Sequence, residues 1–205
     1  KVSIVAHSMG GLLVKEYLRG ITSTDFIDKL ILLGVPELGS PKAFKALTYG
    51  DNFGFGFGPV DIFNIKRSKI ISQNMPGVYE LLPSREYFSR ARAYIYDATG
   101  DTISVPDYDG SLAFMMRDPD NQRNQFLLGK SDQLHSVLDG AGFNLATSSL
   151  YRIAGCQNPK TIGMIRVYPD EEYEIDSIDG DGTVPLASAT ASEVGHAYYA
   201  LHSKT

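Results

Sequence analysis

The sequence contains one cysteine, Cys156, among its 205 residues. A single thiol cannot form a disulfide within the chain, and no cluster of Cys and His has the spacing of a structural zinc site. Neither kind of cross-link is therefore expected to hold the fold, and a packed core must do so. A lone thiol fits a reducing compartment without excluding export, so the sequence leaves the localisation open.

Long apolar runs and an excess of basic residues are also missing. The longest apolar runs, such as residues 30–33, are much shorter than the roughly 20 residues that span a bilayer, so we expect no transmembrane helix. The chain has 19 Lys and Arg against 24 Asp and Glu, without a basic run. It lacks the positive charge that binding to phosphate backbones requires, so nucleic acid is not an expected partner.

What the sequence does contain is the composition of one globular domain, with 43% hydrophobic and 21% charged residues. Residues 1–6 (KVSIVA) form a β-branched apolar run that predicts a strand, and GGLLVKEYLRG predicts a helix that ends at Gly20. Leu13, Tyr17 and Leu18 are expected to share one face of this helix, because residues about four positions apart are neighbours on a helix surface.

The turn between this strand and this helix, HSMGG, matches the nucleophile elbow of serine hydrolases. In such an elbow Ser8 occupies a strained apex, its hydroxyl projects from the sheet, and the N–H of Met9 contributes to an oxyanion hole. Small residues two positions before and after the serine, here Ala6 and Gly10, let strand and helix pass closely. The match is therefore A-x-S-x-G. The alternative is that Ser8 only caps an ordinary turn into a helix, a position that Ser favours.

The hydrophobic pattern predicts an α/β core that is interrupted by a long insertion. Residues 29–35 (KLILLGV) are a near-continuous apolar run, as expected for a parallel strand covered on both faces. Strand character returns at residues 150–154, roughly 110 residues later, whereas an ordinary loop of an α/β protein has about 2 to 6. We therefore expect a core with the elbow at residues 1–40, an inserted cap or lid at 41–148, and a return to the core at 149–205 with the acid loop and the last strand.

Further predictions concern the insertion and the two ends of the chain. Four aromatic residues are expected to line an entry for acyl chains or to pack the cap onto the core: Phe53, Phe55, Phe57 and Phe63. A third interpretation is that the Gly-Phe stretch forms a mobile flap, because alternate glycines lower the cost of rearrangement. A hairpin is predicted between residues 161–167 and 172–175, and a final strand at 197–201.

Residues 1–6 have no initiator Met, signal peptide or turn before them. We therefore expect the chain to be a fragment of a longer protein that contains the C-terminal part of the core, with the second oxyanion donor upstream of Lys1.

The second chemical signal is the segment IDGDGTVP at residues 178–185. A catalytic triad requires an acid after a later strand, placed to fix the tautomer of the histidine. Asp181 is the preferred candidate, because the tight turn that follows would hold its carboxylate at a strand end, and Asp179 is the alternative. The acidic residues here do not have the spacing of a calcium loop, so no metal site is expected.

The base must come from the histidines, which are His7, His135, His196 and His202. His7 adjoins the nucleophile and would point to the opposite side of the turn, and His135 precedes the acid. The chain order Ser, Asp, His of this fold leaves His196 and His202. His202 directly follows the expected last strand and is our candidate. The alternative is a histidine beyond Thr205.

Four segments occur in an order that resembles the lecithin:cholesterol acyltransferase family, which includes phospholipases A: AHSMGG, LLGVPELGSPKA, MPGVYELLPS and GDGTVPLASA. The resemblance implies an α/β-hydrolase core with a cap, and a Ser-Asp-His triad in which Ser8 is the nucleophile and Asp181 the acid. It also implies acyl transfer from a lipid ester to water or an alcohol, without a cofactor. The expected partner is that lipid ester, presented by a membrane or a lipoprotein surface.

Two other functions share these residues. A non-lipid serine esterase, amidase or peptidase of the same fold would have the same elbow and acid, and a catalytically inactive binding protein would keep the fold. Preference for acyl chain length separates the first from a lipid enzyme. Labelling of the full-length protein with a fluorophosphonate separates the second.

Overall fold

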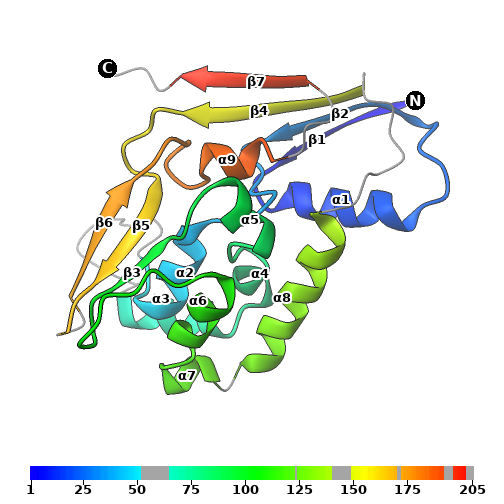
Figure 1. Ribbon diagram of the computed structural model, residues 1–205. Helices are drawn as coiled ribbons and strands as arrows, with labels where there is room; N and C mark the ends of the chain where they lie inside the picture. Colours follow the sequence, from blue (N-terminus) through cyan, green and yellow to red (C-terminus); the bar gives the residue numbers. More distant parts are fainter. Residues whose placement is uncertain (52–64, 123, 140–148, 170–171, 192–195, 202–205) are drawn as a thin grey trace, which may run out of the picture.

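The computed structural model describes residues 1–51, 65–122, 124–139, 149–169, 172–191 and 196–201, and the structural statements below concern these residues. Four parallel strands form the main sheet in the order β1-β2-β4-β7, namely β1 (Val2–His7), β2 (Ile27–Leu33), β4 (Leu150–Cys156) and β7 (His196–Leu201). All four run the same way, so their carboxyl ends meet at one end of the sheet (Figure 1). The strands that the apolar runs predicted are confirmed.

The two faces of this sheet have different surroundings. Ala6, Leu32 and Arg152 lie side by side in the register of β1, β2 and β4, and all three are buried. Their face of the sheet is the one on which α1 (Gly10–Gly20) and α9 (Leu186–Ala189) lie (Figure 1). In the neighbouring row, Ile153 is 37% and Tyr198 is 52% exposed. Since side chains alternate along a strand, the opposite face is left partly open within the described part of the chain.

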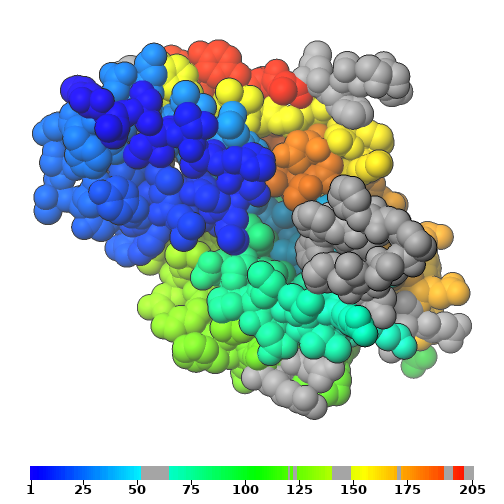
Figure 2. Space-filling model, turned by 180° about the vertical axis from the view of Figure 1, so that it is seen from behind, coloured from blue at the N-terminus to red at the C-terminus, as the bar shows by residue number. Residues whose placement is uncertain are grey.

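α1 presents a different side to the sheet than its apolar pattern predicts. Lys15 and Leu18 are buried, whereas Leu13 is 67% and Tyr17 is 55% exposed. The expected grouping of Leu13, Tyr17 and Leu18 on one face is therefore wrong. Seen from behind, β1 and α1 form a broad outer surface of the molecule (Figure 2).

The orientation of α1 follows from a close contact at its start. A Cβ placed on Gly11 would lie 2.3 Å from a methyl group of Val35, in the loop that follows β2. The helix therefore touches this loop through the bare backbone of Gly11. Lys15 and Leu18 follow four and seven positions later, so they face the same way. The apolar pattern does not show this side of α1, because it includes a buried lysine.

Between β2 and β4 the described chain is mainly helical. The helices are α2 (Pro41–Thr48), α3 (Ile65–Gln73), α4 (Pro76–Tyr79), α5 (Arg85–Arg90), α6 (Tyr108–Met115), α7 (Pro119–Gln122) and α8 (Gln125–Leu138). Figure 1 shows them below the main sheet, on the same side as α1. α2 begins at a capping residue of the expected kind, because the hydroxyl of Ser40 accepts a hydrogen bond from the N–H of Lys42.

A second, smaller sheet has the order β3-β5-β6 and consists of β3 (Ile95–Asp97), β5 (Ile162–Val167) and β6 (Tyr173–Ser177). β5 and β6 are antiparallel, which confirms the predicted hairpin. β3 pairs with β5 in parallel and was not predicted. Because β3 precedes β4 in the chain and β5 follows it, this sheet ties the helical region to the part of the chain that leads to Asp181.

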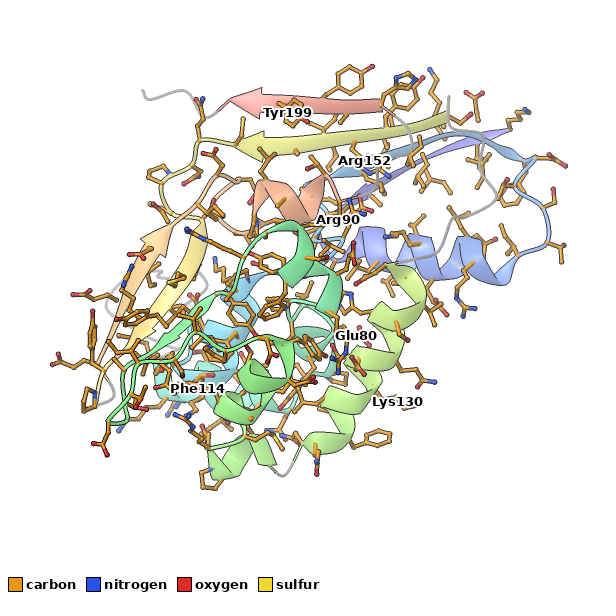
Figure 3. All side chains as sticks on the ribbon, in the orientation of Figure 1. Glu80, Arg90, Phe114, Lys130, Arg152 and Tyr199 are labelled. Atoms are coloured by element: carbon orange, nitrogen blue, oxygen red, sulfur yellow. The ribbon has the colours of Figure 1, made fainter. Side chains whose placement is uncertain are left out.

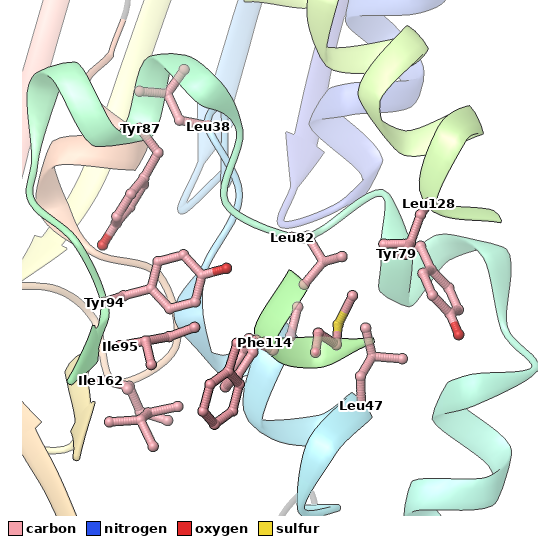
Figure 4. Packing of buried hydrophobic residues seen from close by; sticks show 14 of the residues in the cluster. Leu38, Leu47, Tyr79, Leu82, Tyr87, Tyr94, Ile95, Phe114, Leu128 and Ile162 are labelled. Atoms are coloured by element: carbon pink, nitrogen blue, oxygen red, sulfur yellow. The ribbon is translucent and has the colours of Figure 1, made fainter. Parts of the chain in front are cut away.

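The helical region and the small sheet share an aromatic core (Figure 4). Phe44 and Tyr87 are fully buried and Tyr94 is nearly so. The rings of Phe44 and Tyr94 meet edge to face with centroids 5.4 Å apart, an arrangement that aromatic pairs prefer. Burial raises the pKa of the Tyr94 phenol above its ordinary value. This phenol therefore remains neutral and belongs to the packing of the core.

A separate core lies between α1 and the main sheet and includes Leu12, Leu18, Leu30 and Leu32. Leu81 packs against both cores and so connects them. Ala6 and Leu12, on either side of the turn at Ser8, belong to the second core, and the helical region is packed around the first. Among the helices described, none is long and apolar enough to cross a membrane.

Candidate active site

Ser8 lies at the turn between β1 and α1 with a φ of 53°. This backbone conformation is uncommon for a residue other than glycine, and such strain concentrates at functional sites. The Ser8 N–H donates to the carbonyl of Leu33 at 2.9 Å, and its carbonyl accepts from the N–H of Gly11 at 3.0 Å. Within the described residues, the hydroxyl of Ser8 makes no hydrogen bond. The turn has the strained apex that a nucleophile elbow requires.

Of the two small residues that flank Ser8, only one has the role predicted for it. Ala6 is 6% exposed and fits the expectation of a small residue in a tight place. A Cβ on Gly10 would meet no described atom within 4 Å. The close approach occurs instead at Gly11, against Val35. The prediction of a steric role for Gly10 is therefore wrong, and the second glycine of the pair carries that role.

Met9 places its backbone N–H at the amino-terminal end of α1, which begins at Gly10. Within the described residues this N–H donates no hydrogen bond, and the partial positive charge of a helix N-terminus lies beside it. The side chain of Met9 packs against α4, because a Cβ on Gly77 would lie 3.0 Å from the Met9 sulfur. Met9 thus joins the serine turn to the helical region.

Asp181 lies in the loop between β6 and α9, where one carboxylate oxygen is fixed by the loop itself. Its Oδ1 accepts hydrogen bonds from the N–H groups of Thr183 and Val184, both at 2.8 Å. Oδ2 accepts no hydrogen bond from any described residue. The second oxygen is therefore the one that a histidine N–H could bind.

Two glycines let this carboxylate approach the main sheet. A Cβ on Gly34 would lie 2.8 Å from Asp181 Oδ2, and a Cβ on Gly155 would lie 2.5 Å from the Cβ of Asp181. Gly34 directly follows β2 and has a φ of 50°. Gly155 lies near the end of β4. Any larger side chain at either position would push Asp181 away from the sheet.

Ser8 and Asp181 thereby reach the same end of the sheet. His7, the last residue of β1, pairs with Leu33, the last residue of β2, and Gly34, beside the Asp181 carboxylate, comes next. The N–H of Gly34 donates to the carbonyl of Ile153 on β4 at 2.9 Å. The serine turn, the glycine and the acid therefore follow one another across the carboxyl ends of β1, β2 and β4.

Hydrogen bonds from the loop between β2 and α2, which the sequence pattern does not predict, hold the acid loop. The hydroxyl of Ser40 donates to the carbonyl of Thr183 at 2.5 Å. The hydroxyl of Ser188, which is fully buried, accepts from the N–H of Leu38 at 3.0 Å and donates to the carbonyl of Gly39 at 2.7 Å. The segments LLGVPELGSPKA and GDGTVPLASA, which lie far apart in the sequence, are therefore in contact.

Asp179, the alternative acid, has different neighbours. It lines a surface crevice of about 850 Å³ together with Arg90 and Asn158. Its carbonyl accepts a hydrogen bond from the N–H of Leu186. The geometry beside Gly34 therefore belongs to Asp181 rather than Asp179. Within the described residues, no group of three or more His, Cys, Asp or Glu is placed to hold a metal ion.

The described histidines have different surroundings. His7 is exposed and points to the face of the sheet opposite Ala6. His135 is buried in α8, with Nδ1 2.9 Å from Asp139 Oδ1 and Nε2 2.9 Å from the Glu80 carbonyl. Both of its ring nitrogens are therefore occupied in packing α8.

His196 begins β7 and stacks on Tyr151 at the amino end of the sheet. It is therefore separated from the carboxyl end by the length of β7, about 3.3 Å per residue. Leu201, the last described residue, pairs with Cys156 at the carboxyl end. His202 lies outside the described residues, as do Phe53, Phe55, Phe57 and Phe63.

A parallel sheet with a strained serine turn after one strand and an acid beside the next strands is the arrangement of the α/β-hydrolase fold. The fold is also that of a solved structure titled the crystal structure of the Tle4–Tli4 complex, with a TM-score of 0.66 and 17% sequence identity. The match covers 97% of this chain and 52% of that chain, so this chain spans about half the length of the structure it matches.

The family model of lecithin:cholesterol acyltransferase matches residues 1–120. This is more than half of the chain, so the chain belongs to the lecithin:cholesterol acyltransferase family, and the resemblance seen in the sequence is confirmed. No curated protein matches the sequence significantly.

Proposed function

We propose that this chain carries the nucleophile and the acid of a serine-dependent lipid acyl hydrolase or O-acyltransferase. The observation that supports it most is the strained turn at Ser8, two strands away from a carboxylate that Gly34 and Gly155 admit to the same end of the sheet. Membership of the lecithin:cholesterol acyltransferase family supports a lipid ester as the substrate.

In the proposed reaction, the Ser8 hydroxyl attacks the ester carbonyl while a histidine takes its proton. The oxyanion that forms is bound by the N–H of Met9. The histidine then returns the proton to the leaving alcohol, which departs and leaves an acyl group on Ser8. Water or an acceptor alcohol then attacks the acyl carbonyl while the histidine takes its proton. The histidine gives this proton to Ser8 as the acyl product leaves, and Asp181 Oδ2 stabilises the imidazolium in both halves of the reaction.

We assign the base to His202, with a histidine beyond Thr205 as the alternative. The assignment is supported by chain order and by the position of Leu201, which ends β7 beside Cys156 at the carboxyl end of the sheet. In the full-length protein, His202→Gln should silence hydrolysis of both a phospholipid and a short p-nitrophenyl ester, because loss of the base affects the chemical step whatever the acyl length. If His202→Gln is active and replacement of the first histidine beyond Thr205 is not, the alternative is correct.

Residues 41–148 are proposed to act as the cap of this site. The contact between Met9 and Gly77 supports this, because it places α4 directly beside the residue that follows the nucleophile. A substitution that disrupts residues 41–148 is expected to lower the rate of hydrolysis of long-chain lipids and to leave the rate for a short ester unchanged. The proposed chemistry uses only side chains and backbone groups and calls for no cofactor.

Fluorophosphonate labelling of the full-length protein tests the proposal. A covalent adduct located on Ser8 by peptide mass analysis, together with hydrolysis of phospholipid vesicles, is the expected result. Adduct formation with turnover of short esters or amides alone would favour a non-lipid esterase, amidase or peptidase. No adduct and no turnover would favour a catalytically inactive binding protein.

A further inference from the structure

Three buried charged side chains form a network that joins α1, β4 and the loop after β2. Lys15 Nζ on α1 lies 3.1 Å from Glu37 Oε2, and Arg152 Nε on β4 lies 2.7 Å from Glu37 Oε1. The side chains of Lys15, Glu37 and Arg152 are 5%, 1% and 2% exposed. Arg152 lies between the main sheet and the helices (Figure 3). Each carboxylate oxygen of Glu37 is therefore bound by a cation from a different element.

The elements that meet at Glu37 are those that carry the proposed catalytic groups. α1 begins two residues after Ser8. Arg152 lies on β4, the strand that also contains Gly155, which touches Asp181. Glu37 itself lies in the loop that starts with Gly34. The network thus connects the helix behind the nucleophile to the strand behind the acid, through the loop between them.

Stability does not explain such a network. Removing charged groups from water is costly, and replacing a buried ionic triad by apolar residues of similar size is often neutral or stabilising. Here one carboxylate also faces two cations, so the charges do not balance among the three residues. Hydrogen bonds do supply something that apolar packing lacks, because they fix direction and distance.

We propose that Glu37 is a positioning residue that, through Lys15 and Arg152, sets the separation of Ser8 and Asp181. The proposal rests on the proposed function, since it assigns a role in that reaction. A misplacement of about 1 Å between reacting groups can cost about 100-fold in rate.

The test replaces the whole network in the full-length protein with apolar residues, as Lys15→Met, Glu37→Leu and Arg152→Met combined. We expect the melting temperature to stay equal or rise, and kcat on a short p-nitrophenyl ester to fall at least about tenfold with KM within about threefold. The rate constant for fluorophosphonate labelling of Ser8 should fall in parallel with kcat. A purely structural role would not produce a folded, stable variant with a selectively lower kcat.

The matched control removes an exposed ion pair from the same helix, as Glu16→Gln with Arg19→Met. This pair is about 40% exposed on both sides, and kcat should be unchanged. Wild-type kcat in the stable triple variant overturns the proposal while leaving the proposed function intact. Absence of labelling in the wild-type protein overturns the proposed function, and this proposal with it.

If the triple variant does not fold, Lys15→Met alone decides the question. It leaves Glu37 and Arg152 as a balanced pair at 2.7 Å and removes only the link to α1. We expect it to fold and to lower kcat at least about threefold without a matching change in KM. A folded Lys15→Met variant with the kcat of the wild type would overturn the proposal.

Discussion

The serine turn and the acid loop reach the same end of the sheet by different means. The contacts of Ser8 are local or made to the adjacent strand, because strand, turn and helix follow one another in the chain. The acid loop is held from far along the sequence, as in the bond from Ser40 to Thr183, which are 143 positions apart. The candidate nucleophile is therefore positioned by a short segment of sequence, whereas the position of the candidate acid depends on the assembled fold.

The largest effect is expected at the serine turn. Ser8→Ala in the full-length protein should lower ester turnover by several orders of magnitude while leaving the melting temperature nearly unchanged, because it removes only the attacking oxygen. Steady-state kinetics on a phospholipid and on a short ester measure this. Ser23→Ala, which alters an exposed serine, is the matched control. Retention of more than about a tenth of the activity, a change of less than about 1.4 kcal/mol in the barrier, would refute the assignment.

The next largest effect is expected at the acid. Asp181→Asn should keep the shape of the loop but favour the wrong tautomer of the histidine, and so lower kcat by about four orders of magnitude, as in the serine-protease triad. Asp179→Asn, two positions earlier on the surface crevice, should have little effect on kcat. Circular dichroism verifies that both variants fold. Greater damage from Asp179→Asn than from Asp181→Asn would show that the acid is misassigned.

A third prediction tests whether Gly34 sets the position of the Asp181 carboxylate. Gly34→Ala adds a Cβ that would lie 2.8 Å from Asp181 Oδ2, at a φ of 50° that costs a side-chain-bearing residue about 1–2 kcal/mol. The carboxylate must move, so we expect kcat to fall about 10- to 100-fold and the protein to lose some stability. The rate of labelling of Ser8 should fall as well, although the serine turn itself is unaltered.

Gly129→Ala serves as the control for Gly34→Ala. A Cβ on Gly129 in α8 would meet no described atom within 4 Å. Alanine is also favoured over glycine in a helix by up to about 1 kcal/mol. This control should leave kcat unchanged and leave the melting temperature equal or higher. Equal kcat for Gly34→Ala and Gly129→Ala would mean that Gly34 does not set the position of the acid.

Apolar periodicity and turn residues predicted those elements whose position depends on a short segment of the sequence. The strands of the main sheet, the helix after the turn and the β5–β6 hairpin were all found from apolar periodicity and turn residues. The strained φ of Ser8 agrees with the elbow motif. The roles assigned to Ser8, Met9, Asp181 and His202 remain predictions, and the same holds for the division at residues 40 and 148.

What the sequence did not predict depends on contacts between distant segments. A lysine in a helix is expected to face solvent, but Lys15 is buried because the folded chain brings Glu37 and Arg152 to this side of α1. The predicted grouping of apolar residues on one face of α1 was therefore wrong. Gly10 fitted the motif, but the contact with Val35 falls on Gly11. Pairing of β3 with β5 spans a long stretch of chain, which a three-residue strand cannot reveal.

The smallest effect is expected where the acid loop is anchored. The hydroxyl of Ser188 makes two hydrogen bonds in a fully buried place. Ser188→Ala would leave the N–H of Leu38 and the carbonyl of Gly39 without these partners, at a cost of about 1–3 kcal/mol in the free energy of unfolding. Because Gly34 and Gly155 still define the place of Asp181, kcat should fall only about two- to fivefold at a temperature where the variant is folded.

Urea unfolding and kinetics at 25 °C measure the two effects of Ser188→Ala, with the exposed Ser136→Ala as the control. A loss in kcat as large as that of Asp181→Asn would contradict this picture, because the anchor would then determine the position of the acid more than the glycines do.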